Sequence, residues 1–438
     1  MSQSKIIAGI DVGSTNIITV IAQILKEEGR INVSGVSCFP STGVRKGQIV
    51  DIDRVTEALV NSLEAAERMA GYSVSRAFIS LGGAHIASQN SHGVVAVAEP
   101  EKEIIAEDVR RVIEAARAIS LPSSREIIHC LPRTYTVDGQ EGVVDPLGMN
   151  GIRLEVEAHL ITGSQTAIRN LTKCVTEAGI DIEGLVFSGL AASESVLTET
   201  EKELGVVLVN IGGGTTSVVI FIEGSPVYSS VLPIGAKNVT NDLAIGLRLS
   251  LEAAEKLKLA LSNKQKKVAL PLRKEKEKNK EQTEKNGDEI DLVKLGIYEE
   301  TKSVSRKTLI EGIIRPRLNE IFTMVGLEIK KSSFGGMTPS GIVVCGGGGQ
   351  TVGVVEAAKR TLSLPARIGI PSGITGLVDD ILNPAFAVSL GLIIYGSKEE
   401  TKSGFPRWGI TNFGRIAQRI PVKGLLGKLA NLAKSFLP

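Results

Sequence analysis

The sequence predicts an α/β protein built from two similar halves. Apolar, β-branched runs at residues 6–10 and 17–24 flank a short polar turn, a pattern typical of a hairpin. Runs at residues 206–211 and 218–222 repeat this arrangement about 200 residues later, which indicates an internal duplication. Amphipathic patterns separate the two hairpins; residues 53–70, for example, carry apolar side chains at helical spacing.

Length and composition restrict the class of protein. The 438 residues exceed the size at which one core usually divides, so we expect two lobes, each with further subdomains. Hydrophobic residues make up 42% of the chain, which is an ordinary globular value. The formal net charge of +2 argues against a nucleic-acid partner. Because no apolar run reaches the roughly 20 residues of a spanning helix and no signal-peptide pattern begins the chain, we expect a cytoplasmic protein with peripheral membrane contact at most.

The second half contains one segment of unusual composition. Residues 262–291 are rich in both Lys and Glu and contain few apolar side chains, so we expect a solvated insertion. After it, the pattern predicts a helix from Val304 with Pro316 inside or near its end. A short strand at 342–344 precedes a glycine run and a helix at 352–361, and small residues predict a compact helix at 383–395.

Three glycine-rich turns follow predicted strands. Glycine lets a phosphate approach backbone N–H groups closely because no Cβ intervenes, and hydroxyl side chains add donors. A carboxylate at Asp11 is suited to holding Mg²⁺ through water. Neither a P-loop lysine pattern nor a dinucleotide fingerprint fits these turns. The candidate phosphate-binding residues are Asp11, Gly13, Ser14, Thr15 and Asn16 in the first turn, Asn210, Gly212, Gly213, Gly214, Thr215 and Thr216 in the second, and Gly346, Gly347 and Gly348 in the third.

Taken in order, the turns resemble the phosphate 1, phosphate 2 and adenosine motifs of the actin/Hsp70/sugar-kinase superfamily. Small-residue segments at 188–194 and 383–391 resemble its two connecting helices, and the segment with Glu255 and Lys258 is similar to its nucleoside-contacting helix. The segments 79–86, 130–138, 142–149 and 154–161 resemble the inserted subdomain of one branch, the FtsA family. The resemblance implies a duplicated, actin-like (ribonuclease H-like) two-lobe fold with an FtsA-type inserted subdomain and a C-terminal amphipathic helix.

The same resemblance implies a division of the chain. The expected parts are residues 1–83 plus 162–196 as the first core subdomain, 84–161 as the inserted subdomain, 197–234 plus 326–396 as the second core subdomain, 235–325 as a partner-binding subdomain containing the charged insertion, 397–412 as a flexible linker, and 413–438 as a membrane-targeting helix.

Three residues depart from the superfamily pattern. Asn210 and Ser217 stand where phosphate 2 usually carries Asp, and Asn16 stands where phosphate 1 usually carries Lys. The missing carboxylates weaken Mg²⁺ and water positioning, and the missing lysine removes a charged hydrogen bond worth about 1.5–3 kcal/mol. We therefore expect binding of ATP with Mg²⁺ and weak or absent hydrolysis.

The family resemblance also implies a function in cell division. It implies filament formation on the inner face of the cytoplasmic membrane at the septum, anchoring of the FtsZ ring through the FtsZ C-terminal peptide, and recruitment of late division proteins. Arg306 and Arg315 are candidates for receiving that acidic peptide. Two alternatives remain open on the sequence: a pilus-assembly actin-like adaptor and a small-molecule kinase of the same superfamily.

The C-terminal segment supports the membrane assignment. At 100° per residue its large apolar side chains form one stripe, with lysines off that stripe and no acidic residue after Glu400. Such a helix is suited to lie in an interface containing anionic lipids, because lysines reach the head groups. The residues expected to contact lipid are Val422, Lys423, Leu425, Leu426, Lys428, Leu429, Leu432, Lys434 and Phe436.

Overall fold

The computed structural model describes residues 5–25, 30–97, 103–266, 288–299, 302–377 and 381–401. Three regions singled out by the sequence lie outside the described residues. They are residues 267–287 of the charged segment, residues 402–412 of the expected linker, and the whole expected membrane helix at 413–438 with its lipid-contacting side chains.

The first lobe contains a six-stranded sheet in the order β11-β6-β1-β2-β3-β19. Strands β1, β2 and β3 form an antiparallel meander, while β1 pairs in parallel with β6 and β6 with β11. Helix α1 packs on β2 and β3 and against α3. The elements are β1 (Lys5–Val12), β2 (Asn16–Leu25), β3 (Arg30–Pro40), β4 (Val44–Arg45), β5 (Gln48–Ile49), α1 (Ile52–Ala70), β6 (Arg76–Leu81), α3 (Gln165–Glu177), β11 (Asp181–Phe187) and β19 (Ile374–Gly376).

Local sequence sets the bounds of α1. The Asp51 carboxylate accepts a hydrogen bond from Arg54 N at 3.2 Å, which caps the first turn. Gly71 ends the helix in the left-handed region with φ 80°, where glycine has no Cβ penalty. Between these caps the apolar positions predicted from the sequence face the sheet and are buried, namely Val55, Leu59, Leu63 and Ala66.

The second lobe repeats the first. Its sheet has the order β14-β13-β12-β17-β18, with β12, β13 and β14 as an antiparallel meander and β12, β17 and β18 running in parallel. The duplicated two-lobe α/β fold predicted from the sequence is therefore confirmed. The elements are α5 (Glu199–Leu204), β12 (Val206–Ile211), β13 (Thr216–Ile222), β14 (Ser225–Leu232), η3 (Gly335–Met337), β17 (Ile342–Cys345), η4 (Gly347–Gln350), α11 (Val354–Leu362) and β18 (Ala366–Ile368).

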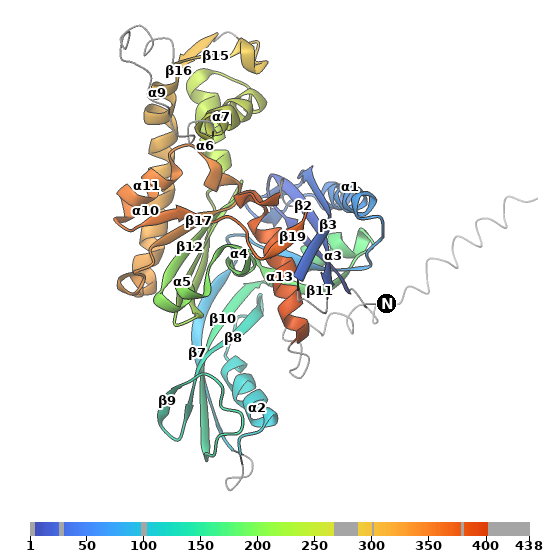
Figure 1. Ribbon diagram of the computed structural model, residues 1–438, viewed down its shortest axis with the longest axis vertical. Helices are drawn as coiled ribbons and strands as arrows, with labels where there is room; N and C mark the ends of the chain where they lie inside the picture. Colours follow the sequence, from blue (N-terminus) through green and yellow to red (C-terminus); the bar gives the residue numbers. More distant parts are fainter. Residues whose placement is uncertain are drawn as a thin grey trace, which may run out of the picture.

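Two small-residue helices lie between the lobes, α4 (Ser188–Val196) and α13 (Ala387–Thr401) (Figure 1). They approach so closely that a Cβ on Gly391 would collide with the carbonyl oxygen of Ala191. The 3-10 turn η5 (Pro384–Phe386) precedes α13. Because α13 continues to Thr401, residues 397–401 of the segment expected as a flexible linker are helical.

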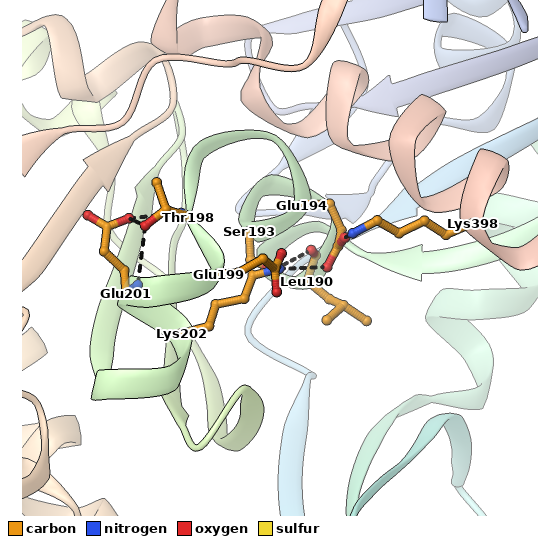
Figure 2. A network of polar contacts seen from close by, with 8 residues as sticks. All are labelled: Leu190, Ser193, Glu194, Thr198, Glu199, Glu201, Lys202 and Lys398. Atoms are coloured by element: carbon orange, nitrogen blue, oxygen red, sulfur yellow. Dashed lines mark hydrogen bonds and ion pairs between the residues drawn. The ribbon is translucent and has the colours of Figure 1, made fainter. Parts of the chain in front are cut away.

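Charged side chains join the ends of these helices to α5 (Figure 2). Glu194 on α4 pairs with buried Lys202 on α5 at 3.3 Å and with Lys398 on α13 at 2.5 Å. Burial raises the pKa of Glu194, but Lys202 and Lys398 together bring that pKa below its ordinary value. The last turn of α13 is thereby fixed to the body of the protein.

The inserted subdomain lies at the opposite end of the molecule from α7, β15 and β16 (Figure 1). Its sheet has the order β7-β10-β8-β9, and α2 packs on β7 and β10. The His159 side chain joins this sheet to β14, because Nδ1 lies 2.7 Å from Asn90 Oδ1 and Nε2 lies 3.0 Å from Ser229 Oγ. The elements are β7 (Ala87–Ala96), α2 (Ala106–Arg117), β8 (Arg125–Val137), β9 (Gln140–Val143) and β10 (Arg153–Ser164).

The remaining subdomain corrects one prediction. Val304 lies in a strand that pairs with Glu289–Asp291, and the helix begins at Arg306. Pro316 lies inside the helical stretch, as predicted, at the start of α10 and directly after a π-helical turn at Ile310–Ile314. Proline cannot donate to the carbonyl four residues earlier, and a widened turn accommodates that loss. The elements are α6 (Ala236–Leu247), α7 (Leu251–Lys266), β15 (Glu289–Asp291), η1 (Val293–Leu295), β16 (Ser303–Ser305), α9 (Arg306–Leu309) and α10 (Arg315–Ser332).

A smaller difference concerns the helix that follows the third glycine turn. The helix predicted at 352–361 begins at Val354, and the preceding glycine run forms the separate 3-10 turn η4. Glycine gives no side chain to hold a regular helix and allows this tighter turn instead.

Within the described ranges, no helix is long and apolar enough to cross a membrane.

Candidate nucleotide-binding site

The first glycine turn joins β1 to β2. Gly13 N donates to Asn16 O at 3.0 Å, which closes the turn. A Cβ on Gly13 would lie 2.7 Å from the same carbonyl oxygen, so the turn requires glycine here. Neighbouring chain segments fix the turn, because Ser41 N donates to Thr15 O at 2.8 Å and Gly47 N donates to Ser14 Oγ at 2.9 Å.

The second turn, between β12 and β13, has the same construction. Gly212 N donates to Thr215 O at 2.8 Å, the counterpart of the bond between Gly13 and Asn16. This equivalence places Asn210 at the position that corresponds to Asp11. Thr216 begins β13, and its hydroxyl donates to Ile234 O at 2.8 Å.

The two turns face one another across the interface between the lobes. A Cβ on Gly213 would collide with the Thr15 hydroxyl, and a Cβ on Gly214 would lie 2.9 Å from Ser14 Oγ. Thr15 Oγ1 is buried and has no hydrogen-bond partner among the residues that the structure describes. A buried hydroxyl of this kind normally has a partner, so its position between two glycine turns fits an external acceptor such as a phosphate oxygen.

The third turn packs on the end of β12. Gly346 N donates to Pro384 O at 2.9 Å, and a Cβ on Gly346 would lie 2.5 Å from Ile211 O. Gly348 also lies against Ile211, whereas a Cβ on Gly347 would meet no atom within 4 Å. The second and third glycine turns thus lie together at the end of β12, and the first turn faces the second across the interface between the lobes.

Glu255 and Lys258 lie on α7 and contact each other. Lys258 Nζ lies 2.7 Å from Glu255 Oε2 and 3.0 Å from Thr240 Oγ1 on α6, and Lys258 is buried. Both residues act electrostatically on Lys237, at the start of α6. Since α6 begins against the second turn, the pair belongs to the same neighbourhood as the glycines.

Asp11 is the carboxylate of the first turn. Its Oδ1 accepts a hydrogen bond from Ser80 Oγ at 2.6 Å, and Val12 N donates to Ser80 Oγ at 3.1 Å. Burial raises the pKa of Asp11 to about 6, although the bond from Ser80 acts in the opposite direction. At neutral pH a carboxylate held in this way is ready to attract a cation or a water bound to it. Within the described parts of the chain, no group of three His, Cys, Asp or Glu side chains forms a ready-made metal cluster.

Sequence reasoning missed two residues of this site, Ser80 and Lys237. Lys237 N donates to Gly213 O at 2.8 Å, and Lys237 Nζ donates to Ser14 O at 2.5 Å across the lobes. A strand followed by Gly235 and a helix containing this lysine was the available signal. Without the fold, nothing in the sequence relates that helix start to the first turn.

The two candidate partner-binding arginines lie apart from the glycine turns. Arg306 Nη2 donates to Leu261 O at 3.3 Å, at the far end of α7. Arg315 pairs with Glu311, one turn earlier on the π-helical segment. The structure therefore gives each arginine a partner of its own within the same subdomain and does not bring the two together.

Comparisons with known proteins identify the family. The family model described as "SHS2 domain inserted in FTSA" matches residues 83–162, and the model described as "Cell division protein FtsA" matches residues 207–391. The cell division protein FtsA of Pseudomonas aeruginosa is 35% identical over 401 residues, with 92% of this chain and 91% of the relative covered. The chain belongs to the FtsA family. FtsA of Borreliella burgdorferi is 36% identical over 396 residues, with 90% of this chain and 92% of the relative covered.

A solved structure shares the fold at lower identity. The chain is similar to one in the "PilM-PilN type IV pilus biogenesis complex", with a TM-score of 0.61 and 16% identity. The match covers 89% of this chain and 98% of the other. This likeness concerns the fold alone. The sequence relatives, at 35% and 36% identity, are cell division proteins, and they favour that class over the pilus adaptor and the small-molecule kinase.

Proposed function

We propose that the chain binds ATP between the two facing glycine turns. The observation that carries the proposal is the buried Thr15 hydroxyl, which has no partner within the described ranges and lies directly against Gly213. Phosphate oxygens are strong acceptors, so a bound nucleotide satisfies this donor, and the glycines leave room for the approach. The remaining proposed nucleotide contacts are those expected from the sequence, with the third turn and the pair Glu255–Lys258 on the nucleoside side.

Asp11 is proposed to hold Mg²⁺ through water. Its fixed position, set by the 2.6 Å bond from Ser80 Oγ, supports this role. When bound, the ion neutralises phosphate charge. At physiological pH most of the Asp11 population is ionised, since its pKa lies about one unit lower, at about 6.

Hydrolysis is proposed to be weak or absent. Asn210 and Ser217 face each other in the register of β12 and β13, and neither is an acid. Both are buried, and Ser217 Oγ lies 3.3 Å from Ser188 Oγ. A neutral amide or hydroxyl accepts a proton from an attacking water far less readily than a carboxylate does, which supports binding without efficient turnover.

At the cellular level, we propose the activity of the family: assembly into filaments on the inner face of the cytoplasmic membrane at the septum. The inserted subdomain at 84–161 would take part in self-association and in contacts with late division proteins. The helix at 413–438 would bind anionic lipid. Residues 1–83 plus 162–196 and 197–234 plus 326–396 would form the core that binds ATP between the lobes, with 235–325 left for a partner.

The proposed partner of residues 235–325 is the C-terminal peptide of FtsZ. Apolar side chains in this subdomain are exposed, among them Ile245 at 79% and Tyr298 at 81%. Glu299 accepts from Ser250 N at 3.1 Å, which holds Tyr298 beside the link between α6 and α7. An apolar surface with Arg306 and Arg315 on the same subdomain fits a peptide that is both apolar and acidic.

Vesicle co-sedimentation tests the proposed membrane binding of residues 413–438. The purified full chain is mixed with vesicles containing anionic lipid, with and without MgATP and with an FtsZ tail peptide. Replacing Leu429 and Phe436 with Glu is expected to abolish sedimentation, whereas Asn431→Glu with Ser435→Glu adds the same charge on the polar face and is expected to keep most of it. Equal sedimentation of the two double variants would contradict the membrane assignment.

A further inference from the structure

Lys237 occupies a position that both lobes define. Strand β14 ends at Leu232, and α6 begins at Ala236. The backbone of this helix start is tied to the second glycine turn, because Ala236 N donates to Gly212 O at 2.9 Å and Lys237 N donates to Gly213 O at 2.8 Å. Gly235 permits this approach, since a Cβ there would lie 2.6 Å from Gly212 O. The backbone of Lys237 is thus hydrogen-bonded to the second turn.

The side chain of Lys237 reaches the other lobe. Its Nζ donates to Ser14 O at 2.5 Å, in the first turn. Ser14 also lies against the second turn, because a Cβ on Gly214 would be 2.9 Å from Ser14 Oγ. The lysine therefore contacts both glycine turns, the second through its backbone N–H and the first through its ammonium group.

The charge of Lys237 compensates for a gap in the first turn. Residues 11–16 contain no Lys or Arg, so this turn contributes no cation of its own. ATP carries several negative charges on its phosphates, and backbone N–H groups alone supply only partial positive charge. Partial burial lowers the pKa of Lys237, and the nearby Lys258 adds to this effect while Glu255 opposes it.

We propose that Lys237 binds the phosphates of the nucleotide and thereby makes the site selective for ATP over a nucleoside. In the nucleotide-free protein its Nζ rests on Ser14 O, and in the complex it turns to the phosphate oxygens. The inference rests on the proposed ATP binding and adds to it a phosphate-contacting residue donated by α6 rather than by the glycine turns.

A different role predicts a different outcome. If Lys237 served only to latch the lobes together, its loss would weaken every ligand of the site equally, because all of them need the closed arrangement. A phosphate contact instead distinguishes ligands by whether they carry phosphates. A charged hydrogen bond of about 1.5–3 kcal/mol corresponds to a roughly 10- to 150-fold change in affinity.

Equilibrium dialysis with labelled ATP and labelled adenosine separates these roles. The proteins are the wild-type chain, Lys237→Met, which keeps the apolar stem, Lys237→Arg, and Lys173→Ala as a control that removes an exposed lysine of α3. Lys237→Met is expected to weaken ATP about 10- to 150-fold and adenosine by less than about twofold. Lys237→Arg and Lys173→Ala are expected to remain within about threefold of the wild type, since both keep a cation at position 237.

Two results would overturn the inference while leaving ATP binding in place. One is unchanged ATP affinity in Lys237→Met, and the other is an equal loss for ATP and adenosine. If the wild-type chain itself binds no ATP, the proposed function fails first and the inference falls with it. Thermal melting of each variant checks that the fold is retained, and a Lys237→Met protein that melts like the wild type but binds ATP normally settles the question against the lysine.

Discussion

The two hairpin turns of this molecule share a backbone and differ in charge. Gly13 N bonds to Asn16 O at 3.0 Å, and Gly212 N bonds to Thr215 O at 2.8 Å, so the geometry is duplicated. Asp11 pairs through 2.6 Å with Ser80 on the neighbouring parallel strand, whereas Asn210 lies opposite Cys345 on the corresponding strand. The comparison teaches that a duplicated fold can keep the same turn backbone in both halves while placing a carboxylate in only one of the two turns.

This asymmetry assigns separate tasks to the lobes. The first turn provides the Asp11 carboxylate, which is proposed to hold Mg²⁺, and the Thr15 hydroxyl, which has no partner among the described residues. The second turn provides glycines and neutral buried polar groups, and the cation beside it, Lys237, comes from the start of α6. The predictions below either erase this difference or enlarge it.

The largest expected effect comes from placing a side chain between the two facing glycine turns. In Gly213→Val, the side chain would strike the Thr15 hydroxyl across the lobes, so ATP binding is expected to fall at least about 100-fold. Because the collision lies between lobes rather than inside one core, the melting temperature should change by only a few degrees. Gly336→Ala, at a glycine with open space around it, is the matched control and should bind normally in the same calorimetric titration.

Removing the one acid of the first turn should be the next largest effect. Asp11→Asn keeps an acceptor for Ser80 but loses the charge, so the Mg²⁺-dependent part of ATP affinity should fall by about tenfold. The wild-type chain should lose the same part as the pH drops through about 6, the pKa of Asp11. Titrations with Mg²⁺ and with EDTA across this pH range measure it. A Mg²⁺ effect that is unchanged in the variant would contradict the assignment.

The stability of the same variant should move in the other direction. The folded pKa of Asp11, about 6, lies above the ordinary value of 3.8, so the folded state binds the proton more tightly than the unfolded chain. This group therefore favours folding at low pH, and its contribution is lost as the pH rises from about 4 through about 6. At pH 7, Asp11→Asn should be more stable than the wild type by about 1–3 kcal/mol in urea unfolding. A variant that is less stable than the wild type at pH 7 would show that burial of the charged Asp11 carboxylate does not destabilise the fold.

Restoring an acid to the second turn should have an intermediate effect. Asn210→Asp recreates the superfamily pattern beside Ser217, and phosphate release is expected to rise at least about tenfold, since a positioned proton acceptor contributes roughly 10²–10⁴-fold. The buried carboxylate should also cost about 1–3 kcal/mol of stability. Asn241→Asp makes the same change at an exposed position on α6 and should leave the rate unchanged. A rate equal to that of the wild type in Asn210→Asp would show that the missing acid is not what limits hydrolysis.

The smallest effects concern the residues beside the two turns. Ser80→Ala removes the hydrogen bond to Asp11 and should weaken MgATP by about threefold, because the carboxylate is less well held. Cys345→Ser gives the second lobe the hydroxyl of the first, and since Asn210 carries no charge to stabilise, MgATP affinity should stay within about twofold. Fluorescence titrations of the two variants in parallel test the asymmetry, and a larger loss in Cys345→Ser than in Ser80→Ala would reverse it.

Much of the fold was predictable because its signals are local. The β-branched runs around Gly13 and Gly213 predicted both hairpins, and the apolar spacing of Val55 and Leu59 predicted α1, since each pattern depends on neighbours within a few residues. The start at Val304 was wrong because alternation in a three-residue strand cannot be distinguished from a helix start. Pro316 lies inside the helical stretch as predicted, but the π turn before it follows from packing and leaves no mark in the sequence.

The site was predictable in its glycines and not in its electrostatics. Asp11, Gly213 and Gly346 stand out because three glycine-rich turns follow predicted strands in order, although any one of them alone is an ordinary turn. The contact of Lys237 with Ser14 joins residues 223 positions apart, so only the duplicated fold brings them together. The bond from Ser80 to Asp11 has the same origin, because parallel pairing of β1 and β6 places the two side chains side by side.

Amide hydrogen exchange with and without MgATP tests the central claim most directly, because it locates the ligand on the chain. The account predicts slower exchange on nucleotide addition in three stretches, at residues 13–16, 212–216 and 346–348, with no comparable change in β8 and β9 of the inserted subdomain. Gly213→Val should show none of this protection under the same conditions. Protection confined to one lobe, or found only outside the three turns, would contradict a nucleotide held between the two halves of the fold.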